Sequence, residues 1–163
     1  MTLTRKANWL LAALAGVGCA ATAQPGAPQL TRYLAKGDQC KQVAELAGTA
    51  TVIKVKMKQG EVPTPAGAEP ESVVGYVIFE EAAKLGWSVE ETRAFAKEIW
   101  DAPPLAGFKW EILRSDLYYQ VACRLATEGK PVRPYATLTD RLQSCLESRD
   151  DNVQRTCATA AIQ

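Results

Sequence analysis

The middle of this sequence contains two pairs of consecutive carboxylates, Glu80-Glu81 and Glu90-Glu91. Neighbouring carboxylates can bind a cation, or share a proton when one pKa is raised by the charge of the other. Both pairs fall in segments with helical periodicity, where consecutive side chains point about 100° apart. The two carboxylates of a pair therefore do not converge on one atom. We interpret both pairs as solvated helix surface, and an enzyme that works through them is the weaker hypothesis.

The absence of histidine restricts the possible chemistry further. The 163-residue sequence contains no histidine. This excludes Ser-His-Asp and Cys-His catalysis, the HExxH metalloprotease motif and every zinc site that uses histidine. We therefore predict a protein that is not an enzyme, with no catalytic residues, no cofactor and no metal site.

The first 23 residues have the three parts of an export signal. Arg5 and Lys6 form a positive start, residues 9–17 form a short apolar stretch, and Ala21-Thr22-Ala23 offers small residues for cleavage. The apolar stretch is too short for a permanent membrane span. We predict cleavage after Ala23 and a periplasmic or secreted protein. Lipidation of Cys19 is the alternative, but Gly16 stands where a lipoprotein signal usually has an aliphatic residue.

Four of the five cysteines follow the predicted cleavage site: Cys40, Cys123, Cys145 and Cys157. An even number of cysteines in an oxidising compartment is typical of structural disulfides. Three connectivities are possible. We favour Cys40–Cys123 and Cys145–Cys157, because the first bridge would join the two ends of the main domain. The second would close two short terminal helices into a hairpin.

Composition points away from nucleic acid and membranes as partners. The mature chain would carry 17 basic and 18 acidic residues, a net charge of −1. Such a balance gives no electrostatic reason for binding a polyanion. We therefore expect no nucleic-acid partner and no stable membrane span. The sequence does not determine the oligomeric state.

Apolar periodicity predicts an all-α fold, a small disulfide-stapled helical bundle. The expected organisation is a flexible leader over 24–37, a helical core domain over 38–128, and a C-terminal helical hairpin over 129–163 packed on that core. Ser88 and Glu91 form a capping box that should begin one helix. The expected helices are 38–59, 71–85, 89–100, 108–128, 139–148 and 152–162.

Two segments leave an alternative open. Residues 51–58 alternate polar and apolar side chains, and residues 72–79 are rich in β-branched and aromatic residues. The alternative is an α+β fold with a hairpin that pairs 51–58 with 72–79. If 71–85 is instead one helix, its N-terminal part is apolar on nearly all sides, which predicts a central, well-buried helix.

Five residues are candidates for contact with a partner protein. Trp110 and Tyr118 lack a clear place on the apolar stripe of the 108–128 helix, and exposed aromatic residues are favoured anchors at interfaces. Lys54, Lys56 and Lys58 form a basic edge. Such an edge could face a partner, where charge sets association rate and selectivity, or simply be solvated.

A further indication comes from Cys40-x3-Ala44, Ile99-Trp100-Asp101-Ala102-Pro103, Tyr119 and Cys123. This pattern resembles that of small secreted helical bacterial proteins with an early and a late cysteine, which have no established activity. The resemblance covers about residues 38–125 and implies that Cys40 and Cys123 pair. In size and architecture the chain is also similar to periplasmic immunity proteins that neutralise toxins that degrade the cell wall.

These observations together favour an exported, non-enzymatic helical protein that binds another protein, as an inhibitor or immunity factor does. The partner would lie in the cell envelope. The alternative is a module that binds a small ligand or the cell envelope itself, with its pocket between helices.

Overall fold

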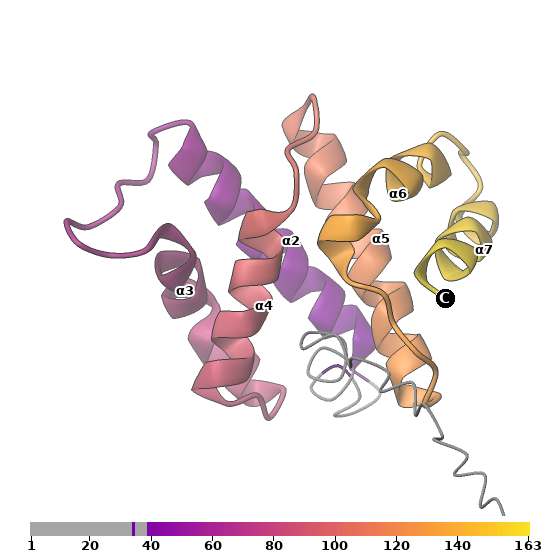
Figure 1. The fold of residues 1–163 in the computed structure, drawn as a ribbon, viewed down its shortest axis with the longest axis horizontal. Coiled ribbons are helices and arrows are strands. Elements are labelled where there is room, and N and C mark those ends of the chain that lie inside the picture. The colour runs from indigo at the N-terminus through magenta and orange to yellow at the C-terminus, as the bar shows by residue number, and fades with distance from the viewer. Residues whose placement is uncertain (1–33, 35–38) are drawn as a thin grey trace, which may run out of the picture.

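The computed structural model describes Leu34 and residues 39–163, and these residues are all-helical (Figure 1). The predicted signal peptide, most of the predicted leader, and residue 38, the first of the expected 38–59 helix, lie outside the described residues. The elements are α2 (Cys40–Lys58), α3 (Pro70–Lys84), α4 (Val89–Asp101), α5 (Phe108–Thr127), the 3-10 turn η1 (Tyr135–Thr137), α6 (Thr139–Cys145) and α7 (Asp151–Ile162).

The all-α prediction is confirmed for the described residues, and the alternative hairpin is wrong. Residues 51–58 belong to α2 and residues 72–79 belong to α3. The short alternation in 51–58 misleads because both faces of α2 are partly covered there. Val55 and Met57 are buried as expected, but Lys54 is buried as well. Helical packing over the whole segment thus outweighs the local pattern.

An antiparallel pair, α2 and α5, forms the centre of the molecule. α3 and α4 pack against α2 on one side, and α6 and α7 pack against α5 on the other (Figure 1). A chain of aromatic rings crosses the core between them: Trp87 contacts Phe95, and Phe95 contacts Tyr119, with centroids 5.0 and 4.8 Å apart. Tyr118 and Tyr135 continue this chain into η1.

Both disulfides have the favoured connectivity. Cys40 and Cys123 are joined across 83 residues with their Cα atoms 5.4 Å apart, which fixes the start of α2 to the end of α5. Cys145 and Cys157 are joined across 12 residues with their Cα atoms 5.5 Å apart, which links α6 to α7. The first disulfide therefore joins the central helix pair at one end, and the second joins the two C-terminal helices to each other.

The turn between α3 and α4 shows how local sequence sets the helix ends. Gly86 adopts φ +76°, a left-handed conformation that other residues rarely adopt, and this ends α3. The predicted capping box is present: the Glu91 N–H donates to Ser88 Oγ at 3.2 Å, and the Ser88 N–H donates to Glu91 Oε2 at 2.7 Å. α4 therefore begins where the sequence predicts.

The position of α3 corrects the expectation of a central, well-buried helix. α3 lies at the edge of the bundle (Figure 1). Its buried residues are Val74, Gly75, Ile78 and Ala82. The opposite side exposes Tyr76, Val77 and Phe79 by 85%, 53% and 39%. The apolar excess of this helix is therefore not used by the core.

We predict that the two disulfides differ in their effect on stability. In the chain-entropy treatment, Cys40–Cys123 contributes about 4.5 kcal/mol to the free energy of unfolding, and Cys145–Cys157 contributes about 3 kcal/mol. Urea denaturation of the Cys40→Ala/Cys123→Ala and Cys145→Ala/Cys157→Ala variants would measure both. Equal losses, or a larger loss from the second variant, would contradict this ranking.

Candidate functional site

An exposed apolar surface on α3 and the start of α4 is the candidate functional site. It consists of Tyr76, Phe79 and Val89, and is called the α3–α4 face. Val89 is 48% exposed, and Tyr76 and Phe79 are 85% and 39% exposed, while the exposed Val77 lines a different hollow, on the α2 side of α3. Single exposed apolar residues are ordinary, but a contiguous cluster of large ones is typical of a binding surface.

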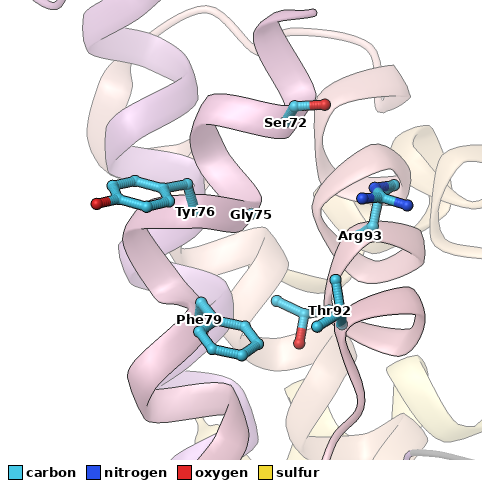
Figure 2. A pocket seen from close by; sticks show the side chains of 7 residues that line it. Ser72, Gly75, Tyr76, Phe79, Thr92 and Arg93 are labelled. Atoms are coloured by element: carbon cyan, nitrogen blue, oxygen red, sulfur yellow. The ribbon is translucent and has the colours of Figure 1, made fainter.

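A groove of about 400 Å³ runs along this face between the two helices. Figure 2 shows Phe79 of α3 and Thr92 of α4 on facing sides of the groove, with Arg93 further along α4. Tyr76 projects from the outer side of α3 (Figure 2). The lining is mostly apolar, so the groove is suited to apolar side chains rather than to a charged metabolite. Its residues are Ser72, Gly75, Tyr76, Phe79, Val89, Thr92 and Arg93.

Gly75 sets the distance between the two walls of the groove. A Cβ at this position would lie 3.5 Å from the Ala96 Cβ and 3.9 Å from the Arg93 Cα. α3 and α4 therefore meet closely at Gly75. Ser72 and Phe79 lie two helical turns apart, so they share the side of α3 that lines the groove, whereas Tyr76 contacts the groove at its margin and directs its ring outward (Figure 2).

The orientation of α4 depends on a buried ionic cluster behind the groove. Lys54 is 1% exposed; its Nζ donates to the Ala102 carbonyl at 2.6 Å and lies 3.2 Å from Glu111 Oε1. Arg114, also 1% exposed, donates from Nη2 to the Pro103 carbonyl at 2.6 Å and from Nε to the Tyr135 hydroxyl at 3.0 Å. Two cations thus hold the chain that leaves α4.

Burial shifts the pKa values of the groups in this cluster. Desolvation lowers the pKa of Lys54, and the Glu111 carboxylate partly opposes that shift. Desolvation also raises the pKa of Tyr135 to about 12, so its hydroxyl stays protonated and accepts from Arg114. The cluster has no water-accessible acid or base and serves to hold the helices together.

Glu98 forms a second polar link, between α4 and η1. Its Oε1 accepts from the Tyr135 N–H at 2.7 Å, and its Oε2 accepts from the Tyr119 hydroxyl at 2.9 Å. Desolvation raises the pKa of Glu98 from 4.5 to about 7, although both hydrogen bonds favour the charged form. This carboxyl lies within the α4–α5 interior rather than in the groove.

The residues of the two acidic pairs have separate local surroundings. Glu91 caps α4, and Glu81 is held by Lys84 at 2.6 Å, while Glu80 and Glu90 are exposed on different helices. Within the described residues, no group of three or more Cys, Asp or Glu side chains could hold a metal ion. Over the same residues, no helix is long and apolar enough to cross a membrane.

The predicted partner-binding residues divide into buried and exposed ones. Lys54 and Tyr118 are 1% and 0% exposed, so both must be removed from the predicted set. Lys54 fails because it pairs with Glu111, and Tyr118 because its hydroxyl donates to the Arg133 carbonyl at 2.7 Å inside the bundle. Glu111 and Arg133 are not adjacent in sequence to the residues they contact, so the local sequence pattern gave no sign of these two contacts.

The other three predicted residues are exposed but lie away from the α3–α4 face. Trp110 is 48% exposed and lines a separate, more polar groove between α5 and α7. Lys56 and Lys58 are exposed on α2, and the Lys58 ammonium lies over the Trp100 ring, 5.2 Å from its centroid. The structure therefore does not bring these residues together into one surface.

Sequence reasoning missed Tyr76, Phe79 and Val89. A signal for them was present, because 72–79 has more apolar residues than one buried helix face can use. The sequence could not show that the excess faces outward.

Comparison with protein-family models, with curated proteins and with solved structures finds no match for this chain.

We predict that Lys54→Met destabilises the protein by about 3–5 kcal/mol, because it leaves the Glu111 carboxylate buried without its cation. The double variant Lys54→Met/Glu111→Gln should recover much of this loss, because both charges are then removed and no charge is buried without its partner. Urea denaturation of the wild type, both single variants and the double variant gives the coupling energy. Strictly additive losses would show that the pair is not coupled.

We predict that Glu98 makes the protein less stable as pH rises. Its pKa is higher in the fold than in the unfolded chain, so its protonated form is favoured by folding. The stability it contributes is complete below about pH 4.5 and is lost as pH rises through about 7, by at most about 3 kcal/mol. Denaturation of wild type and Glu98→Gln at several pH values should show a flatter profile for the variant. An unchanged slope between pH 4.5 and 7 would contradict this.

Proposed function

We propose that this is an exported, non-enzymatic protein that binds another protein through the α3–α4 face, as an inhibitor or immunity-type factor does. The observation that carries the proposal is the exposure of Tyr76, Phe79 and Val89 on adjoining helices around one groove. Export is supported by the signal-like first 23 residues and by two disulfides, which form in oxidising compartments.

The composition of the face agrees with protein binding. Tyrosine and phenylalanine bury large areas at low entropy cost, and a few such anchors usually supply most of the binding energy of an interface. The aromatic chain and the buried ionic cluster hold α4, and α3 packs closely on α4 where Gly75 meets Ala96, so the anchors lie on helices that are packed before a partner arrives. Preorganisation of this kind reduces the entropy lost on binding.

A second candidate function is the binding of a small apolar ligand or of a cell-envelope component. The groove volume of about 400 Å³ favours it, since ligand pockets usually measure about 300–1,000 Å³. Against it, Tyr76 projects away from the groove and would remain exposed with a small ligand bound (Figure 2). A protein partner could cover both the groove and Tyr76.

Site-specific photocrosslinking would test the proposal. A photoreactive phenylalanine analogue placed at Phe79 should give a discrete adduct with one envelope protein, because this side chain would lie inside the interface. The matched control is Val153, which is 53% exposed on α7, far along the chain from the face. Excess wild-type protein should suppress the adduct, and excess Tyr76→Asp/Val89→Asp variant should not.

Two outcomes would contradict the proposal. An adduct at Trp110 but not at Phe79 would place the interface on the α5–α7 side, as sequence reasoning suggested. Equal labelling at Phe79 and Val153 would show that the α3–α4 face has no specific partner.

A further inference from the structure

We infer that the occupant of the α3–α4 groove is an amphipathic helix of a partner protein with basic side chains along the margins of its apolar stripe. This inference rests on the proposed function and adds to it the chemistry of the partner. It is carried by the shape of the groove, by the charge of the two helices that form it, and by the positions of their unpaired carboxylates.

The shape of the site favours a helix as the bound element. The described residues contain no β-strand, so no exposed strand edge is present to which an extended peptide could add. The groove instead lies between two packed helices and is lined by Phe79, Thr92 and the backbone at Gly75. Apolar side chains at positions i, i+3, i+4 and i+7 of a third helix can enter such a groove.

The charge of the two helices is strongly one-sided. Residues 69–101 contain eight acidic and three basic residues, a net charge of −5. Two of the three cations are held in salt bridges within this unit: Lys84 with Glu81 at 2.6 Å, and Lys97 with Asp101 at 2.7 Å. Arg93, the third, lines the groove. The unit as a whole therefore favours a basic partner.

Among the described residues, six carboxylates of this unit lie outside its two salt bridges. Glu91 caps α4 and Glu98 is hydrogen-bonded in the interior, which leaves Glu69, Glu71, Glu80 and Glu90. Glu80 follows Tyr76 by about one helical turn and is exposed, so it continues the exposed side of α3. Glu69 is also exposed and lies at the N-cap of this helix. Glu90 directly follows Val89 on α4 and is exposed. An exposed carboxylate thus follows an apolar residue of the face on each helix, Glu80 after Tyr76 and Glu90 after Val89, and basic residues that flank an apolar stripe could pair with them.

The same carboxylates argue against a lipid surface as the occupant. Bacterial and other biological membranes present anionic headgroups, which attract basic rather than acidic segments. An acidic margin around the apolar residues would be repelled by such a surface. An acidic helix would be repelled in the same way, which leaves the basic amphipathic helix as the favoured class.

Fluorescence anisotropy with designed peptides tests this inference on the full mature protein. The probe is a labelled Leu/Lys peptide of about five helical turns (~18 residues) with one apolar stripe. A Leu/Glu peptide with the same stripe and a scrambled Leu/Lys peptide without a stripe are the matched controls. We expect the striped Leu/Lys peptide to bind at least about tenfold more tightly than either control.

Protein variants locate the binding. Glu80→Lys/Glu90→Lys should weaken the Leu/Lys peptide by about tenfold at low salt, and most of this difference should disappear near ~1 M salt, where the Debye length is about 3 Å. Phe79→Ala should weaken binding by at least about tenfold at both salt concentrations. Val153→Ala should leave binding unchanged, and circular dichroism checks that every variant is folded.

The outcomes separate this inference from the proposed function. If the Leu/Glu or scrambled peptide binds equally well, or charge reversal at Glu80 and Glu90 has no effect, the basic-helix inference is overturned. The proposed function stands in that case if the photoreactive residue at Phe79 still gives its specific adduct. If that adduct is missing, the proposed function itself fails, whatever the peptides do.

Discussion

The structure depends on two buried cations that bind the same short stretch of backbone. Lys54 of α2 donates to the Ala102 carbonyl, and Arg114 of α5 donates to the Pro103 carbonyl, each at 2.6 Å. Removing two cations from water is costly, and the cost is tolerable only where strong acceptors surround them. The carbonyls at the end of α4 are such acceptors, because the prolines that follow prevent the helix from continuing and using them. The central helix pair and the end of α4 therefore stabilise one another.

This arrangement explains why α4 is fixed by polar contacts at several points, whereas α3 keeps one uncovered side. α4 is fixed at its C-terminal end by the two cations, in its middle by Glu98, and at its start by the capping box. α3 has no comparable polar link to the central helix pair in the described residues. It is held by small and aliphatic contacts such as Gly75 against Ala96 and by the buried Val74 and Ile78. The outer side of α3 is left uncovered, and the helix packs on α4, which is fixed by the polar contacts above.

Much of the fold was predictable from the sequence because its signals are local. The helix over 89–101 follows from Ser88 and Glu91, and the end of α3 follows from Gly86. The disulfide pairing was favoured because Cys145 and Cys157 lie on adjacent short helices, whereas Cys40 and Cys123 lie at the two ends of the main domain. Both bridges agree with that argument.

The candidate site was less predictable because it depends on contacts between distant residues. Lys54 was assigned to the surface because lysine usually lies there. Its burial depends on Glu111 and Ala102, which are remote in sequence. The apolar pattern of α3 was assigned to the core because apolar residues are usually buried. Periodicity shows how many sides of a helix are apolar, but it does not show how many neighbours the topology provides to cover them.

The acidic margin of the α3–α4 face also affects how the protein behaves without a partner. An exposed cluster of Tyr76, Phe79 and Val89 would favour association between copies if its surroundings were electrically neutral. Two copies that met through this face would bring the Glu80 and Glu90 carboxylates of one copy into the same interface as those of the other, and like charges across an interface are unfavourable. The carboxylates that would attract a basic helix thus also oppose self-association. A single charge pattern can therefore select the partner and keep the apolar residues available for it.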